Sequence, residues 1–232
     1  MMRLDKFLSE AGVASRKELK TMIKSGRVKV DGAAAKVPDM KIDDTKQHIT
    51  VDGVAVKQAG QVVLMMHKPS GFVTSTSDPR DRTVMELLPE EYRHMDLFPV
   101  GRLDKETEGL LLFTNDGDLG HRLTSPKHQV EKEYYAETEG TPTEEDTKAF
   151  QEGITLRDGT ECLPADLYVE EEGCRVVVRE GKYHQVRRML ASRGTPVTYL
   201  RRIREGKLTL GGLPLGETRL LTAEEVELLL YK

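Results

Sequence analysis

The sequence predicts an α+β protein in two parts: a small N-terminal module with two helices and a hairpin, and a larger domain with a mixed, mainly antiparallel sheet flanked by helices. Three observations favour this fold class. Apolar runs of strand length dominate beyond residue 60, helix-type segments do not alternate regularly with them, and a basic amphipathic segment lies near the N-terminus. A doubly wound fold would need that regular alternation.

The N-terminal module is expected to span residues 1–60. Ser15 followed three residues later by Glu18 is a capping box, which predicts a helix that ends at Gly26. Three apolar residues indicate a helix before it: Leu4, Phe7 and Leu8. Residues 27–32 alternate Val with basic residues and end in Asp-Gly, which predicts a hairpin.

The larger domain is expected to span residues 61–232. Its predicted strands are residues 62–68, 110–114, 131–137 and 174–180, and its predicted helices are residues 143–153, 184–194 and 222–231. Thr222 and Glu225 form a capping box for the last helix. The run 110–114 is wholly apolar apart from its last residue and is followed by Asn115-Asp116-Gly117, so we expect a strand buried on both faces and then a tight turn.

Composition excludes several classes of protein. Charged residues make up 32% of the 232 residues, and the first residues already carry charges, so neither a signal peptide nor a membrane span is predicted and a cytoplasmic location is expected. The two cysteines, Cys162 and Cys174, form no metal-binding spacing, and we expect buried reduced thiols and no metal. Motifs for phosphate cradling, dinucleotide binding, zinc proteolysis and serine esterase chemistry do not occur.

Charge is segregated along the chain, although its net value is −4. Residues 1–30 hold eight Lys or Arg against three acids, and residues 180–207 hold eight against two. Either basic island alone could be a solvated face. Two islands on an acidic body predict binding to a polyanion at defined places.

Four stretches carry residues suited to chemistry: 67–71, 101–112, 131–137 and 180–189. Each has a plain structural explanation when taken alone. Lys68 to Gly71 could be a turn after a strand, Asp104 a surface charge, Tyr134 a strand aromatic and Arg187 a solvent-facing helix residue.

Together and in this order, the four stretches resemble the pseudouridine synthases of the RsuA type, which isomerise uridine in RNA. Gly101-Arg102-Leu103-Asp104, followed by Thr107, Gly109 and a leucine run, is similar to the signature around the catalytic aspartate of that family. The resemblance covers nearly the whole chain. Residues 1–60 resemble the small RNA-binding module shared by a ribosomal small-subunit protein and tyrosyl-tRNA synthetases. The resemblance implies the pseudouridine synthase fold for residues 61–232.

The resemblance also implies residue roles. Asp104 matches the nucleophile, and a carboxylate suits that role because it is ionised at neutral pH. Arg187 matches the partner that keeps this carboxylate charged, and Tyr134 matches the tyrosine that packs on the target base. Arg102 matches the position that fills the space of the flipped-out base, and Lys68 lies in a loop that shapes the pocket.

RNA is therefore the expected partner, with no cofactor and no metal. The residues predicted to contact RNA are Arg102, Lys68, Arg16, Lys17, Lys20, Lys24, Arg27, Lys182, His184, Gln185 and Arg188.

Four substrates or roles stay open at this point. The short C-terminus makes the chain most similar to the enzyme that modifies one uridine of 16S rRNA, while relatives of similar layout act on 23S rRNA. A non-catalytic RNA-binding ribosome-assembly factor is the alternative from another class, and a tRNA-directed enzyme is a weaker one. Free rRNA or a partly assembled ribosomal particle could be bound, and a monomer is expected.

Overall fold

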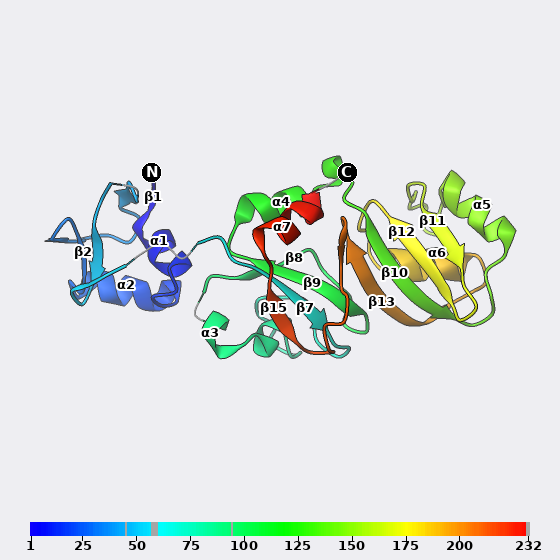
Figure 1. The fold of residues 1–232 in the computed structure, drawn as a ribbon, viewed down its shortest axis with the longest axis horizontal. Coiled ribbons are helices and arrows are strands. Elements are labelled where there is room, and N and C mark those ends of the chain that lie inside the picture. The colour runs from blue at the N-terminus through cyan, green and yellow to red at the C-terminus, as the bar shows by residue number, and fades with distance from the viewer. Residues whose placement is uncertain (45, 57–59, 94, 231–232) are drawn as a thin grey trace. The chain divides into compact units, whose positions relative to one another are not determined.

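The computed structural model of the chain describes residues 1–44, 46–56, 60–93 and 95–230 (Figure 1). The chain divides into two compact units. Unit 1 comprises Met1–Val62 and Leu88–Phe98, and unit 2 comprises Val63–Leu87 and Pro99–Lys232. The later segment groups with unit 1, where Asp96 accepts a hydrogen bond from Arg16 over 2.9 Å. Among the described residues, no helix is long and apolar enough to cross a bilayer.

Unit 1 joins short helices to two small sheets. Its elements are α1 (Leu4–Glu10), α2 (Arg16–Lys24), α3 (Glu90–Arg93), β1 (Met2–Arg3), β2 (Val28–Val30), β3 (Ala33–Ala34), β4 (Lys41–Ile42), β5 (Ile49–Val51) and β6 (Val54–Ala55). The sheet order is β3-β2-β5-β6, and β1 pairs separately with β4. Both predicted helices and the predicted hairpin are therefore confirmed.

The capping box of α2 forms as predicted. The Ser15 hydroxyl accepts from the backbone N–H of Glu18, and the Glu18 carboxylate accepts from the backbone N–H of Ser15 over 3.0 Å. This satisfies donors that a helix start would leave without partners. Leu19 and Ile23 on the inner face are buried against α1 and β2, which leaves the basic outer face of α2 exposed.

Unit 2 is built on one large mixed sheet. Its path is β11 (Asp166–Val169), β12 (Cys174–Val178), β10 (Lys132–Thr138), β13 (Val197–Glu205), β9 (Glu108–Thr114), β7 (Val63–Lys68) and β15 (Thr218–Leu220), with β14 (Leu208–Thr209) on β13 and β8 (Phe98–Val100) on β9. The strands of this path pair antiparallel except β9 and β13, which run parallel. The α+β class is confirmed.

Helices flank this sheet. They are α4 (Gly117–Thr124), α5 (Glu144–Glu152), α6 (Gln185–Ser192) and α7 (Ala223–Leu230), with the 3-10 turns η1 (Val84–Leu87) and η2 (Pro126–His128). Helix α4 contacts β9 and α7, whereas α5 contacts β11 and α6 contacts β13 (Figure 1). The predicted last helix begins with its capping box at Thr222, and Tyr231 lies outside the described residues.

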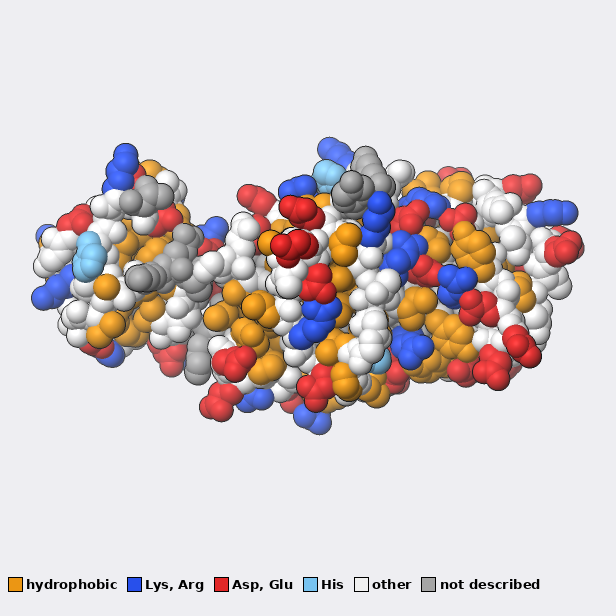
Figure 2. Space-filling view, viewed as in Figure 1, with side chains coloured by type: hydrophobic (Ala, Val, Ile, Leu, Met, Phe, Trp, Pro, Cys, Tyr) orange, Lys and Arg blue, Asp and Glu red, His pale blue; other side chains and the backbone are white. Residues whose placement is uncertain are grey.

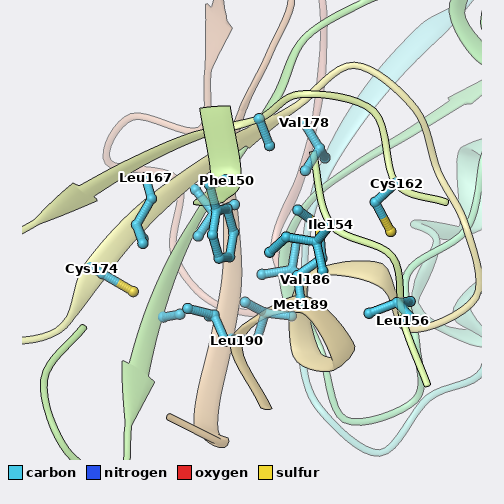
Figure 3. Close-up of a cluster of buried hydrophobic side chains, with 14 residues drawn as sticks. Phe150, Ile154, Leu156, Cys162, Leu167, Cys174, Val178, Val186, Met189 and Leu190 are labelled. Atoms are coloured by element: carbon cyan, nitrogen blue, oxygen red, sulfur yellow. The ribbon is translucent and has the colours of Figure 1, made fainter. Parts of the chain in front are cut away.

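Two apolar clusters hold the helices on the sheet. In the first, Phe150 of α5 and Met189 and Leu190 of α6 are fully buried against β10, β12 and β13 (Figure 3). Cys162 and Cys174 lie in this cluster as free thiols, as predicted, and burial raises the pKa of Cys174 to about 11. The second cluster packs α4 and α7 on β9 and β7, and Leu110 and Leu112 of the predicted buried strand have no exposed surface.

Strands β10, β13 and β9 lie side by side at Arg202. Tyr134 of β10 and Gly109 of β9 are the register partners of Arg202 on its two sides. Gly109 has a φ of 110°, and a Cβ atom added to it would lie 2.2 Å from the Arg202 carbonyl oxygen. Only glycine fits this position, so the start of β9 is tied directly to β13.

Two elements differ from the prediction. The turn expected at Asn115-Asp116-Gly117 starts helix α4, because the Asp116 carboxylate accepts from the backbone N–H groups of Asp118 and Leu119 over 2.9 and 3.1 Å. Strand β13 was not predicted, since three arginines and a glutamate in nine residues hide its apolar face. Pairing with β10 on one side and β9 on the other stabilises β13 despite its weak local strand pattern.

Candidate active site

Asp104 lies on a loop that leads into the buried strand β9. The loop turns tightly, with the Thr107 N–H donating to the Asp104 carbonyl over 3.0 Å. Thr74 supports the preceding residue, because its hydroxyl donates to the Leu103 carbonyl over 2.7 Å. The Asp104 side chain keeps 35% of its surface exposed, so the carboxylate projects from a rigid base into accessible space.

Lys68 fixes the same loop through hydrogen bonds. Its ammonium group donates to the carbonyls of Lys105 and Thr107 over 3.1 and 2.9 Å and to its neighbour Pro69 over 3.0 Å. The residue has no exposed surface. The prediction that Lys68 binds RNA is therefore wrong, because all three donors of the group are used inside the protein.

Burial of Lys68 makes the stability of the fold depend on pH. Burial lowers the pKa of its ammonium group from 10.5 to about 8, against the opposing effect of nearby carboxylates, chiefly Glu106. Below pH 8 the folded state keeps a charge that is costly to bury. Between the two pKa values the unfolded chain binds more protons than the folded chain, so the free energy of unfolding rises with pH across this window.

We expect wild type to gain stability relative to Lys68→Met between about pH 7.5 and pH 10, by no more than about 3 kcal/mol. Urea unfolding at a series of pH values measures the difference. Lys105→Met is the control, because Lys105 is exposed and its ion pair with Asp81 raises its pKa above the tested window. A pH-independent difference for Lys68→Met would contradict the lowered pKa.

A small cavity of about 70 Å³ opens beside Asp104. Polar side chains from three segments meet in its wall, among them Arg102, Asp104, Tyr134, Glu180, Lys182 and His184. The apolar residues Val178, Val186 and Leu200 complete it. The cavity therefore combines an apolar floor with one accessible carboxylate and several basic groups, as expected of a site that takes a flat polar ring.

His184 is the nearest ionic partner of Asp104. Its Nε2 atom lies 3.5 Å from a carboxylate oxygen of Asp104, and its side chain is 39% exposed. His184 adopts a φ of 48° just before α6, and its ring stacks on Tyr183 with 3.9 Å between centroids. The chain thus places the imidazole over the carboxylate, although the sequence indicated only an RNA contact for this residue.

Tyr134 forms one wall of the cavity from strand β10. Its ring packs against the first apolar cluster, and burial raises the pKa of its hydroxyl while the Arg202 guanidinium opposes that rise. The phenol therefore stays neutral at physiological pH. Tyr135 points to the other face of the sheet, where its hydroxyl donates to the Glu172 carbonyl over 2.7 Å.

Arg187 projects from α6 toward the Asp104 loop. Its guanidinium donates to the carbonyls of Glu106 and Val197 over 3.4 and 3.5 Å. Within the part of the chain that the structure describes, its guanidinium forms no ion pair with the Asp104 carboxylate, in contrast to His184. Arg187 nevertheless contacts the same loop through its hydrogen bond to the Glu106 carbonyl, two residues after Asp104.

The other predicted RNA contacts in unit 2 differ in accessibility. Arg102 is exposed at the cavity rim. Lys182 pairs with Glu180 over 3.1 Å, and Gln185 is buried with its amide donating to Glu180 over 2.8 Å. Arg188 pairs with Asp158 and is partly exposed. Gln185 thus supports the cavity wall from inside.

The predicted contacts in unit 1 lie on one helix and the hairpin that follows. Lys17, Lys20 and Lys24 are exposed on α2. Arg16 pairs with Asp96 over 2.7 Å, and Arg27 pairs with Asp52, which lies in the turn after β5. The three lysines are therefore the strongest positive feature of α2.

Its charge would lead one to expect that the basic island of residues 180–207, including residues 199–207, lines the catalytic cleft, but only part of this island lines the cavity. Arg202 is buried, with 1% of its surface exposed. Arg204 pairs with Glu133 and Glu131 over 2.6 and 3.2 Å. The register of β13 against β10 shifts between Arg202 and Arg204, the partners of Tyr134 and Glu133, and this irregularity sends the two side chains to different faces of the sheet, which composition alone does not reveal.

Two supporting residues were missed at the sequence level. Arg202 contacts the strand after the Asp104 loop, since its Nε donates to the Leu110 carbonyl over 2.7 Å, and it forms an ion pair with Glu205 over 3.3 Å. Thr74 supports the loop itself. Both residues act through backbone carbonyls far away in sequence, so no local motif marks them.

Comparisons with known proteins agree with this fold and site. Residues 62–192 match the RNA pseudouridylate synthase family, and residues 2–46 match the S4 domain. A solved structure described as that of a pseudouridylate synthase superposes with a TM-score of 0.69 at 33% identity, covering 99% of this chain and all of that one. The matching fold therefore includes both units of the chain.

Relatives that match over nearly their full length indicate the type of pseudouridine synthase. The chain is 43% identical over 228 residues to the ribosomal small subunit pseudouridine synthase A of Vibrio cholerae, covering 97% of this chain and 98% of the relative. It is 34% identical over 237 residues to the ribosomal large subunit pseudouridine synthase B of Bacillus subtilis, covering 98% and 95%. The chain belongs to the RNA pseudouridine synthases, and among them to the RsuA type.

Proposed function

We propose that this enzyme converts one uridine of ribosomal RNA to pseudouridine, with 16S rRNA as its substrate. The observation that carries the proposal is the single cavity in which the accessible Asp104 carboxylate and the Tyr134 ring meet basic side chains. The 43% identity to the small-subunit relative from Vibrio cholerae supports 16S rRNA, and the similarity to the large-subunit relative from Bacillus subtilis keeps 23S rRNA as the alternative. Action on ribosomal RNA would place the protein in the cytoplasm.

In the proposed reaction, an oxygen of Asp104 bonds to C1′ of the target uridine as the bond between C1′ and N1 breaks. The base leaves with the electron pair of that bond. After the base turns, carbon 5 forms the new bond to C1′ and the carboxylate is released. Carbon 5 then loses its proton and N1 gains one, so atoms and charges balance without a cofactor.

The remaining residues of the cavity have supporting roles in this proposal. Tyr134 offers a ring on which uracil stacks, and its hydroxyl takes part in removing the proton from carbon 5. Arg102 at the rim occupies the space of the extruded base, since the uridine must leave its stack to reach Asp104. Arg187 supplies positive charge to the loop that carries the nucleophile, and the His184 imidazole lies 3.5 Å from the Asp104 carboxylate.

Unit 1 is proposed to bind the RNA, while unit 2 carries out the reaction. Lys17, Lys20 and Lys24 present three charges on one exposed face of α2, which suits contacts with phosphates. Residues 1–60 would then act as the RNA-binding module and residues 61–232 as the catalytic domain. A non-catalytic assembly factor would need the same module but no accessible carboxylate in a basic cavity.

Tritium release from RNA labelled at carbon 5 of uridine tests the substrate. Separate 16S and 23S transcripts, and partly assembled particles of each subunit, are the substrates to compare. We expect one tritium released per 16S molecule and none from 23S rRNA, because the family acts at specific uridines. Release from 23S rRNA alone would transfer the proposal to the large subunit, and tight binding without release would favour the assembly-factor role.

A further inference from the structure

Tyr183 has the most exposed ring among the Tyr and Phe residues that the structure describes. It keeps 73% of its surface exposed, compared with 49% for Tyr168, the next most exposed ring. It lies on the segment between β12 and α6, which also supplies Lys182 and His184 to the cavity beside Asp104. The proposed reaction gives this ring no role, and a ring left in water adds nothing to the apolar core.

The segment that carries Tyr183 is fixed by hydrogen bonds. The backbone N–H of Lys182 donates to the side-chain oxygen of Gln185 over 3.0 Å, and the backbone N–H of Gln185 donates to the Lys182 carbonyl over 3.2 Å. The Arg188 guanidinium donates to the Tyr183 carbonyl over 3.3 Å. The ring is therefore exposed on an ordered turn, so a ligand that binds against it loses little affinity to backbone ordering.

Two direct contacts connect Tyr183 to the proposed nucleophile. Its ring stacks on the His184 imidazole, with 3.9 Å between centroids and 16° between planes. The Nε2 atom of His184 in turn lies 3.5 Å from a carboxylate oxygen of Asp104. Because His184 covers one face of the Tyr183 ring, the exposed surface belongs to the other face and the edge. An open aromatic face thus lies one ring beyond the residue next to Asp104.

We propose that the open face of Tyr183 stacks on the nucleobase next to the target uridine in the RNA strand. The inference rests on the proposed function, because it assumes that the uridine occupies the cavity beside Asp104. Extrusion of that uridine draws the adjoining nucleotide toward the rim of the cavity, and a base splayed out of its stack buries its face on an aromatic side chain. Every base has a π-face, so the contact supplies affinity and register without selecting one base.

Tyr168 offers a matched comparison on the other face of the sheet. It is the register partner of Arg175, which in turn pairs with Tyr135, and Tyr135 points away from the face that carries Tyr134. Figure 2 shows hydrophobic side chains interspersed with both acidic and basic ones over the strands labelled β10 to β13 in Figure 1. A surface of mixed charge attracts a polyanion weakly, so Tyr168 should stay outside the RNA contact.

Fluorescence of a single tryptophan tests the contact, because the chain contains no tryptophan of its own. Tyr183→Trp and Tyr168→Trp each introduce one exposed indole, and each variant is titrated with the 16S transcript. We expect RNA to quench the emission of Tyr183→Trp by about half through stacking, and to change that of Tyr168→Trp by less than about a tenth. Unchanged emission of Tyr183→Trp at saturating RNA, or equal quenching of the two variants, would overturn the proposal.

Truncation of the ring measures its contribution to affinity. Tyr183→Ala should raise the filter-binding Kd for the 16S transcript about tenfold, whereas Tyr183→Phe, which keeps the ring, and Tyr168→Ala should stay within about twofold of wild type. A slower single-turnover rate for Tyr183→Ala with an unchanged Kd would also overturn the proposal, because the ring would then only hold His184 in place.

Both readouts measure binding, so they are independent of the reaction. If wild type releases no tritium from any RNA, the proposed function fails, and quenching together with Kd still decides whether Tyr183 stacks on a base. Thermal melting of all variants should match wild type, since both side chains are exposed.

Discussion

Replacing Asp104 with Asn should lower the rate of tritium release by at least about four orders of magnitude, as expected when a covalent nucleophile is lost. The amide keeps the shape of the carboxylate but cannot form the bond to C1′. RNA affinity should stay equal or improve, because one negative charge leaves a basic cavity. Single-turnover kinetics and filter binding measure the two effects separately.

Asp118→Asn is the matched control for this variant. Asp118 is an exposed carboxylate on α4 that lies outside the cavity, so the same chemical change there should leave the rate within about twofold of wild type. Retention of more than about a tenth of the wild-type rate by Asp104→Asn would show that another group performs the attack. Loss of binding together with activity would instead indicate a damaged fold.

Arg202→Met should destabilise unit 2 by about 3–5 kcal/mol, because it leaves the Glu205 carboxylate buried without its partner. Both side chains have 1% of their surface exposed, and Lys132, 3.9 Å from Glu205, compensates only in part. The variant also removes the hydrogen bond from Arg202 to Leu110. Urea unfolding at neutral pH measures the loss.

The double variant Arg202→Met with Glu205→Gln separates charge from packing. It removes both buried charges, so we expect it to recover more than about half of the lost stability. Lys105→Met is the surface comparison: it breaks an ion pair whose side chains are 43% and 40% exposed, and should cost less than about 1 kcal/mol. A double variant as unstable as Arg202→Met would assign the effect to the contact with Leu110.

The strands with strong local patterns were predictable. Leu110 to Phe113 are apolar without interruption, and all four are fully buried in β9, so the strand after Asp104 follows from sequence alone. Helix α2 follows equally well from Ser15 and Glu18. Strand β13 did not, because its arginines interrupt the apolar pattern and its pairing partners lie far away in sequence.

The site was predictable in its residue types but not in its contacts. The resemblance of Asp104 and Tyr134 to a family signature pointed to residues that the fold brings to one cavity. It did not indicate that the His184 imidazole would lie beside the Asp104 carboxylate, or that Lys68 would be buried. Contacts of this kind depend on how the folded backbone brings distant segments together. A short sequence motif does not show which segments will meet.

The sequence by itself determined the class of fold, the two-part organisation and the family to which the chain belongs, because capping boxes, apolar runs and ordered motifs are local properties of the chain. The tertiary structure decided which charges are used inside the protein and which face solvent. Lys68 and Arg202 are cations like Lys17 or Arg102 in sequence, yet they are buried and bind backbone carbonyls. The physical reason is that the cost of burying a charge is offset only by partners that folding brings from distant segments.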